Sequence, residues 1–219
     1  MKIEVIENVL KYNKDQADKN RKLFKDSKLL VLNLLSSPGA GKTSLVLETI
    51  KRLEGKKNIG VIEGDISSTY DAEKIGKLTD NVVQINTGGS CHLNAAMIAR
   101  AIGKLKMRSL DLLIIENVGN LICPSGFDLG EDYKIVMSSV SEGDDKPVKY
   151  PPVFIKSNLI ILNKMDLMEV SDFNQDFFEN KVRELNSDSE IIKLSCKTGF
   201  GLEKWISWVL DHCKVHNNQ

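Results

Sequence analysis

The chain has 219 residues, which is the size of one α/β domain, alone or with a small extension. Apolar residues make up 42% and charged residues 27%, so the chain can bury a core and does not have the composition of a disordered protein. Basic and acidic residues number 30 each, and this balanced charge argues against a general nucleic-acid-binding protein. We therefore predict no nucleic-acid partner.

Membrane insertion and secretion are also disfavoured. The longest apolar runs, such as residues 29–35, are the length of a strand and far too short to cross a membrane. Acidic residues interrupt the N-terminal stretch and no small-residue cleavage site follows, so we expect no secretory signal. The four cysteines (Cys91, Cys123, Cys196 and Cys213) are widely spaced and do not resemble a disulfide framework. We expect a cytoplasmic protein with reduced thiols and no membrane partner.

Helices and strands are predicted to alternate along the chain. The first helix is expected over residues 2–27, with Ile3, Ile6, Val9 and Leu10 on one side, but no hydrophobic pattern continues past Tyr12, which predicts a mobile second half. Strands are expected over 29–35, 58–63, 82–85, 112–115, 135–140, 159–162 and 191–194, and further helices over 42–53, 92–106, 177–185 and 202–210. This alternation predicts a doubly wound, mostly parallel sheet. The predicted organisation is a helical extension (1–28), an α/β domain (29–213) and a polar tail (214–219).

A phosphate-binding loop follows the first predicted strand. Residues 36–43 read SSPGAGKT, a Walker A sequence with Ser36 where the first glycine usually stands. Small residues let backbone N–H groups face phosphate oxygens, Lys42 would lie along the β- and γ-phosphates, and the Thr43 hydroxyl would ligate Mg²⁺. An ordinary glycine-rich turn is disfavoured because a strand precedes the run and a helix follows it. The predicted phosphate-binding residues are Gly39, Ala40, Gly41, Lys42, Thr43 and Ser44.

A second motif predicts that the base is guanine. Residues 163–166 read NKMD after an apolar strand, and the Asp166 carboxylate can accept hydrogen bonds from guanine N1–H and the 2-amino group. Adenine offers no such pair of donors, so the motif favours a GTPase over an ATPase. The stretch 195–197 (SCK) resembles the loop that contacts the guanine carbonyl in GTPases. The predicted base-binding residues are Asn163, Lys164, Asp166, Ser195, Cys196 and Lys197.

Two acidic residues at strand ends are candidates for magnesium binding and catalysis. Asp65 ends the strand VIEGD, and Glu116 opens ENVGN where many GTPases have a second switch segment. With Thr43 they are the predicted Mg²⁺ ligands, and with Lys42 they are the predicted catalytic residues. Asp65 is also the candidate for orienting the attacking water, and the alternative is that it caps the helix that follows. With no glutamine or arginine finger in an obvious place, slow intrinsic hydrolysis is expected.

Cysteine and histidine residues form a further candidate site, which is suited to a transition metal. Cys91 and His92 are expected at the start of a helix, and Cys123 follows the presumed second switch on the same side of the sheet. Two sulfur atoms and an imidazole suit Zn²⁺ or Ni²⁺. Adjacent Cys91 and His92 are expected to project in different directions, so that a two-fold dimer would complete the site from both chains. The alternative is that the cysteines are small core residues.

These motifs together resemble the HypB-type hydrogenase nickel-incorporation GTPases, which belong to the SIMIBI class of P-loop GTPases. The matching stretches are 36–43, 63–65, 87–95, 114–124, 141–151 and 163–166, in order along the chain. The resemblance implies a GTPase that forms a homodimer with GTP, works with other hydrogenase maturation proteins and passes nickel toward the [NiFe]-hydrogenase active site. It also implies that Cys91, His92 and Cys123 form a metal site at the dimer interface. It further implies that Lys146 reaches the neighbour's nucleotide, where the alternative is a solvated loop lysine.

The sequence departs from some members of that family. It has neither an N-terminal cysteine-rich motif nor a histidine-rich stretch, so N-terminal nickel capture and nickel storage are not expected. His212 and His216 are four residues apart on a possible C-terminal helix, but a polar, fraying tail is the favoured interpretation. Two other functions remain open at this stage. One is a urease-type nickel accessory GTPase, and the other is a GTP-dependent regulator whose cysteines serve only in packing.

Overall fold

The structure is a computed structural model that describes residues 8–217, so the predicted helix positions Ile3 and Ile6 lie outside the described residues. The strands are β1 (Leu30–Ser36), β2 (Ile59–Asp65), β3 (Val82–Asn86), β4 (Leu112–Glu116), β5 (Tyr133–Ser139), β6 (Leu159–Asn163) and β7 (Glu190–Lys193). The helices are α1 (Asn8–Asp26), α2 (Lys42–Leu53), α3 (Tyr70–Gly76), α4 (Ala95–Ile102), α5 (Lys146–Lys149), α6 (Pro151–Ile155), α7 (Gln175–Leu185) and α8 (Leu202–Asn217). No helix in this range is long and apolar enough to cross a membrane.

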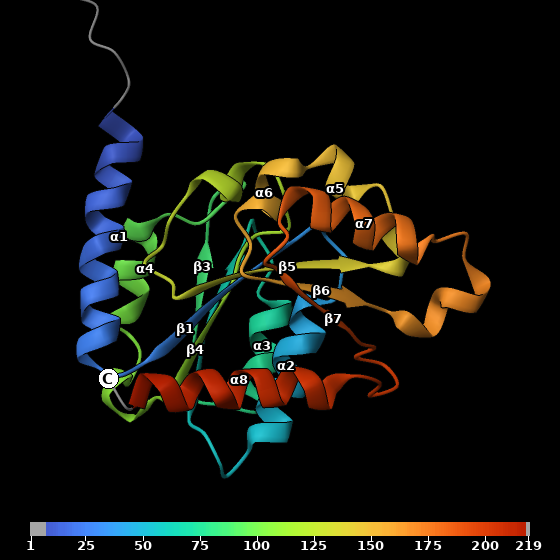
Figure 1. Ribbon diagram of the computed structural model, residues 1–219. Helices are drawn as coiled ribbons and strands as arrows, with labels where there is room; N and C mark the ends of the chain where they lie inside the picture. Colours follow the sequence, from blue (N-terminus) through green and yellow to red (C-terminus); the bar gives the residue numbers. More distant parts are fainter. Residues whose placement is uncertain (1–7, 218–219) are drawn as a thin grey trace, which may run out of the picture.

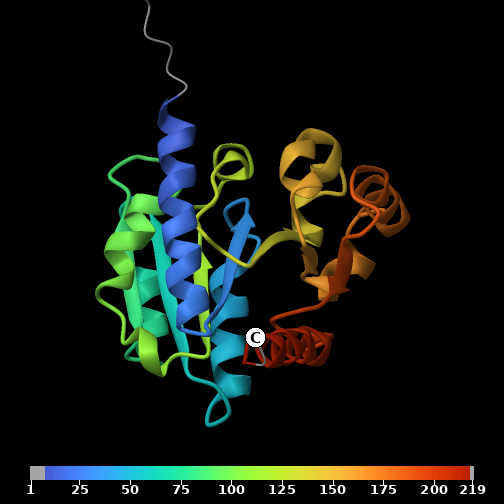
Figure 2. The ribbon, with the colours of Figure 1, turned by 60° about the vertical axis from the view of Figure 1, so that its left-hand side comes forward.

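The seven strands form one parallel sheet in the order β3-β2-β4-β1-β5-β6-β7 (Figure 1). Helices α2, α3 and α8 cover one face, whereas α1 and α4 cover one half of the other face and α6 and α7 cover its second half (Figure 2). Every residue of β1 is buried, as expected for a central strand with helices on both sides. The predicted doubly wound parallel architecture with an N-terminal helix is confirmed.

Helix α1 is packed against the rest of the domain along most of its length, which differs from the expectation. It runs without a break to Asp26, and the apolar pattern that ends at Tyr12 is continued by buried residues at helical spacing. These residues are Asn13, Ala17, Asn20 and Phe24, of which two are polar. The expectation of a mobile second half was therefore wrong, because asparagine side chains with hydrogen-bond partners pack a helix face as firmly as apolar ones.

Helices α5 and α6 were not predicted, and the remaining helices differ from expectation mainly at their ends. Helix α4 begins only at Ala95, capped by the Asn94 side chain, so Cys91 and His92 lie in the preceding loop and not at the helix start. Helix α8 continues to Asn217 through most of the expected polar tail. In α8 the His212 ring stacks on Trp208 at 3.8 Å and its Nδ1 lies 2.7 Å from the Trp208 carbonyl oxygen, which is a packing arrangement. The side chain of His216 lies outside the described residues.

Candidate functional site

The phosphate loop connects β1 to α2 and packs tightly against the Asn163 side chain. Gly41 has a φ of +104°, and a Cβ there would lie 2.5 Å from the Asn163 amide nitrogen, so only glycine fits. Lys42 is buried, and its Nζ donates to the Ser36 hydroxyl at 2.9 Å. Burial lowers the pKa of Lys42, and the neighbouring Glu116 carboxylate opposes this shift. The serine that replaces the first Walker glycine thus gives the lysine a hydrogen-bond partner.

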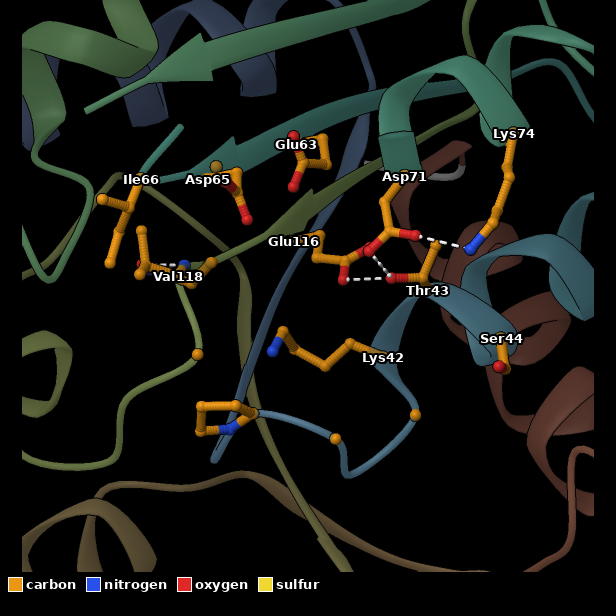
Figure 3. A pocket seen from close by; sticks show the side chains of 16 residues that line it. Lys42, Thr43, Ser44, Glu63, Asp65, Ile66, Asp71, Lys74, Glu116 and Val118 are labelled. Carbon is orange, nitrogen blue, oxygen red and sulfur yellow. Dashed lines mark hydrogen bonds and ion pairs between the residues drawn. The ribbon is translucent and has the colours of Figure 1, made fainter. Parts of the chain in front are cut away.

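Acidic side chains from three elements converge on the cavity beside this loop. The cavity has a volume of about 460 Å³ and lies at the carboxyl ends of β1, β2 and β4 (Figure 3). The Thr43 hydroxyl lies 2.8 Å from Glu116 Oε1 and 3.2 Å from Asp71 Oδ2. Thr43 and Glu116 are both predicted to hold Mg²⁺ and are 73 residues apart in the sequence. The fold therefore brings them into contact.

Two acidic residues of this cavity were missed from the sequence. Asp71 lies in the first turn of α3, where it was read only as part of a helix, and Glu63 lies within β2, paired in register with Glu116 on β4. One carboxyl oxygen of Glu63 and one of Glu116 are buried without a hydrogen-bond partner. Burial raises the pKa of both groups, to about 8 for Glu63. Unpartnered hard oxygen donors of this kind fit Mg²⁺ beside a triphosphate.

Asp65 lines the same cavity but also has a structural task. Its Oδ1 accepts hydrogen bonds from the backbone N–H groups of Ser67 at 2.8 Å and Ser68 at 2.6 Å. These bonds fix the turn that follows β2, whereas α3 begins only at Tyr70 after Thr69. Asp65 therefore caps a turn and not the helix itself, and its roles toward Mg²⁺ and water stay predictions.

The predicted base-binding residues surround a second cavity of about 220 Å³. Asn163 donates to the Ala40 carbonyl oxygen at 2.8 Å and accepts from the Cys196 N–H at 3.1 Å, so it ties the phosphate loop to the 195–197 loop. The Ser195 hydroxyl donates to Asp166 Oδ1 at 2.6 Å and thereby orients the carboxylate. The cavity is lined by Gly41, Ser44, Asn163, Lys164, Asp166, Leu167, Cys196 and Lys197.

Lys146, at the start of α5, lies against the phosphate loop of its own chain. Its Nζ is 3.4 Å from the Ser37 hydroxyl and 3.9 Å from the Glu142 carboxylate, and the side chain is largely buried. It is therefore not a freely solvated loop lysine. A reach across a dimer stays a prediction of the resemblance.

The cysteine and histidine side chains meet within one chain. Ligand atoms of Cys91, His92 and Cys123 all lie within 4.8 Å of one another, and Cys91 Sγ is 3.7 Å from His92 Nδ1. Such separations suit a single ion with bonds of roughly 2.0–2.3 Å. The expectation that Cys91 and His92 point in different directions was wrong, because both lie in a loop whose backbone turns between them. Both cysteines are half-buried, so they are not core residues.

The surroundings of His92 favour the ligand form of the imidazole. The Phe127 ring packs on the His92 ring with centroids 3.9 Å apart. Burial lowers the pKa of His92, so the ring is neutral at physiological pH. The hydrogen bond with Cys123 raises the pKa of the Cys91 thiol, so an ion must displace a proton there.

Two loops carry the candidate metal ligands: the first metal loop holds Cys91 and His92, and the second metal loop holds Cys123. Helix α1 holds the backbone next to both loops. Asn13 donates to the Asp128 carbonyl oxygen at 2.8 Å and accepts from the Ala95 N–H at 2.9 Å. Asn20 donates to the carbonyl oxygens of Ala95 at 2.9 Å and Leu129 at 3.0 Å. Ala95 lies shortly after Cys91 and His92, and the 128–129 segment lies shortly after Cys123. The helix beside α4 in Figure 2 therefore fixes the spacing of the two loops.

Comparisons with known proteins agree with this geometry. The nucleotide-binding domain family CobW/HypB/UreG matches residues 30–193. The hydrogenase maturation factor HypB of Escherichia coli strain K12 is 45% identical over 207 residues, which cover 94% of this chain and 71% of that protein.

Two solved structures superpose closely. HypB from Archaeoglobus fulgidus has a TM-score of 0.87 and 39% identity, with 93% of this chain and 99% of that chain covered. HypB from Helicobacter pylori in complex with nickel has a TM-score of 0.88 and 36% identity, with 93% and 95% covered. The chain therefore belongs to the family of HypB hydrogenase maturation factors.

Proposed function

We propose that this protein is a GTP-hydrolysing metallochaperone that forms a homodimer with GTP bound and delivers nickel during [NiFe]-hydrogenase maturation. One observation carries the proposal. The segment that begins at Glu116, in contact with Thr43 of the phosphate loop, ends seven residues later at Cys123 of the Cys91, His92 and Cys123 cluster. The nucleotide and the ion thus contact one short stretch of chain. The similarity to a HypB solved in complex with nickel supports nickel as the cargo.

The phosphate cavity supports a hydrolytic role. Backbone N–H groups of the loop and Lys42 would bind the phosphates, while Thr43, Glu116 and Asp71 would hold Mg²⁺. The ion, when bound, supplies positive charge to the β- and γ-phosphate oxygens. Asp65 would orient the attacking water, and the turnover is expected to be slow because the described residues that line the phosphate cavity include no glutamine or arginine.

The cluster of Cys91, His92 and Cys123 supports a nickel site whose affinity depends on the bound nucleotide. With GTP bound, two chains would associate, and Lys146 of each would approach the nucleotide of the other. Hydrolysis would loosen residues 116–123 and with them the Cys123 ligand. The same three ligands accept Zn²⁺, so the cargo assignment rests on the relatives. Other hydrogenase maturation proteins are the proposed partners that load and receive the ion.

The proposal is tested by measuring Ni²⁺ affinity and particle mass with GDP and with a non-hydrolysable GTP analogue. We expect a dimer with the analogue, and a Ni²⁺ dissociation constant that differs about fivefold or more between the nucleotides. Equal affinity and equal stoichiometry in both states would exclude coupling. Cys123→Ala should abolish tight binding, whereas Cys213→Ala, in the core away from the cluster, should retain it. A Cys91→Ala and Cys123→Ala variant that still supports hydrogenase maturation with unchanged GTP turnover would instead indicate a regulator without metal transfer.

A further inference from the structure

Three buried polar side chains contact one another beside the central strands β1 and β4. Asn33 interrupts the apolar run of β1 and is fully buried, Asn117 follows β4 and is 2% exposed, and Glu131 precedes β5 and is 9% exposed. Burying such groups costs free energy unless each finds hydrogen-bond partners. Besides one another and Lys134, their partners are backbone N–H groups beside the phosphate cavity and near the metal ligands.

The side-chain oxygen of Asn117 joins two segments of different function. Asn117 Oδ1 accepts a hydrogen bond from the Val118 N–H at 3.0 Å and another from the Leu93 N–H at 3.1 Å. Val118 lines the phosphate cavity, whereas Leu93 directly follows Cys91 and His92. Two N–H donors on one atom fix the orientation of the amide. A single oxygen thus connects the phosphate cavity to the first metal loop.

The amide nitrogen of Asn117 leads toward the second metal loop. It donates to Asn33 Oδ1 at 3.3 Å, and Asn33 donates to Glu131 Oε1 at 3.0 Å. The other Glu131 oxygen accepts from the Leu129 N–H at 2.7 Å. Leu129 lies two residues beyond Phe127, whose ring packs on His92. Both directions of the network therefore end beside the metal ligands.

The Asn117 segment is placed to respond to the terminal phosphate. A Cβ at Gly119 would lie 3.0–3.1 Å from atoms of Pro38 in the phosphate loop, so the segment packs directly against that loop. A Val118 N–H that turns toward a γ-phosphate would leave Asn117 Oδ1 with the Leu93 N–H as its remaining donor. The hydrogen bond to Leu93 then has a different strength in the two nucleotide states.

We propose that Asn117 is the positioning residue that transmits the presence of the γ-phosphate to the Cys91–His92 loop through its hydrogen bond to the Leu93 N–H. The proposal deepens the proposed function, on which it rests for the identity of the cargo. The coupling itself is a property of the protein without metal and is measured in that form. A network that only satisfies buried polar groups would protect the Leu93 N–H equally in both nucleotide states.

The test is amide hydrogen exchange of Leu93 in the full-length, metal-free protein, saturated with GDP or with a non-hydrolysable GTP analogue. We expect the exchange rate to differ about fivefold or more between the two nucleotides in the wild type, at the lower end of allosteric couplings. Equal rates in the wild type would overturn the proposal without any variant.

Matched variants locate the effect. Asn117→Ala removes the acceptor and should abolish the difference, whereas Asn117→Asp keeps an acceptor oxygen and should restore at least part of it. Asn86→Ala is the control, because the exposed Asn86 ends β3 and its side chain accepts a hydrogen bond from the Gly88 N–H and not from Leu93 or Val118, and it should behave as the wild type. A nucleotide-dependent difference that persists in Asn117→Ala would overturn the proposal. If Asn117→Ala does not fold, the near-isosteric Asn117→Leu replaces it.

Ni²⁺ titration of the same samples separates the two proposals. A wild type that shows the exchange difference but binds no Ni²⁺ would refute the proposed cargo and leave the transmission through Asn117 intact. A wild type that binds Ni²⁺ with nucleotide-dependent affinity, with equal exchange of Leu93 in both states, would refute the role of Asn117 alone.

Discussion

Glu63 on β2 and Glu116 on β4 lie side by side in register, both buried, at the edge of the phosphate cavity. Two carboxylates so placed repel each other when both are ionised. The cavity is also lined by the cations Lys42 and Lys74 and by two further acidic residues, Asp65 and Asp71. Its acidic side chains therefore outnumber its basic ones, and magnesium bound with a nucleotide would supply the missing positive charge.

The stability of the protein without nucleotide and metal should fall as the pH rises. Burial, followed by the Glu116 charge, raises the pKa of Glu63 from 4.5 to about 8. The folded protein thus keeps a proton that the unfolded chain loses, so the stabilisation is complete below pH 4.5 and is lost as the pH rises toward 8. Urea unfolding at about pH 5 and about pH 8 measures this, and Glu63→Gln should reduce the difference. Exposed Glu169→Gln should not, and a Glu63→Gln variant with the full pH dependence would contradict the assignment.

Asp166→Asn should weaken GTP binding by about 100-fold or more, because one of the two acceptor oxygens becomes an amide N–H that faces a guanine donor, and the charge of the carboxylate is lost. Titration with a fluorescent GTP analogue measures the loss. Exposed Asp172, which lies outside both cavities, provides the control variant Asp172→Asn with affinity like the wild type. An Asp166→Asn affinity within about twofold of the wild type would mean that the base lies elsewhere.

Gly119→Ala should lower kcat for GTP hydrolysis by roughly tenfold to 100-fold. The added methyl group would press on Pro38 and shift the segment that follows Glu116 away from the phosphate loop. Phosphate release under saturating GTP is the measurement. Gly126→Ala is the control, since a Cβ there meets nothing within 4 Å. Normal turnover in Gly119→Ala would show that this close approach is dispensable.

Binding of Ni²⁺ at neutral pH should release protons from the thiols and none from His92. Burial keeps the His92 pKa low, while the bond to Cys123 raises the pKa of Cys91. Calorimetry in two buffers of different ionisation enthalpy counts the protons. Cys91→Ala should lower the count by about one and His92→Ala should leave it unchanged. A drop in His92→Ala as large as in Cys91→Ala would show that the imidazole is protonated before binding.

Asn20→Ala should destabilise the protein by roughly 1–3 kcal/mol. The substitution leaves the carbonyl oxygens of Ala95 and Leu129 without their donor in a buried place. The free energy of unfolding in urea measures the effect, with exposed Asp15→Ala on the same helix as control. Equal stability of the two variants would mean that α1 is held by its apolar contacts alone.

The sheet and the nucleotide motifs could be predicted because their signals are local. A short, mostly apolar run such as residues 29–35, followed by a glycine-rich loop, favours a strand buried on both faces, and the loop 36–43 needs its glycines for the turn. The NKMD motif places Asn163 at the end of β6, and the structure shows its amide between two loops.

Other features depend on partners that a sequence pattern does not reveal. Asn13 and Asn20 look like solvent-exposed residues until the chain that they bond to is in place. Glu63 looks like one residue of an alternating strand, and only the register with Glu116 places it in the cavity. The direction of His92 relative to Cys91 follows no helix or strand period, since both lie in a loop.

The strand order has a consequence for how nucleotide information is divided. The phosphate loop follows central β1, the predicted guanine-binding residues follow β6 and β7 on one side, and the Cys91–His92 loop and Cys123 follow β3 and β4 on the other. In the proposed function, the identity of the purine and the length of its phosphate chain would consequently be read by opposite halves of the sheet. Substitutions after β6 that change the purine specificity of the protein should therefore leave unchanged the effect of the phosphate chain on the affinity for the metal ion.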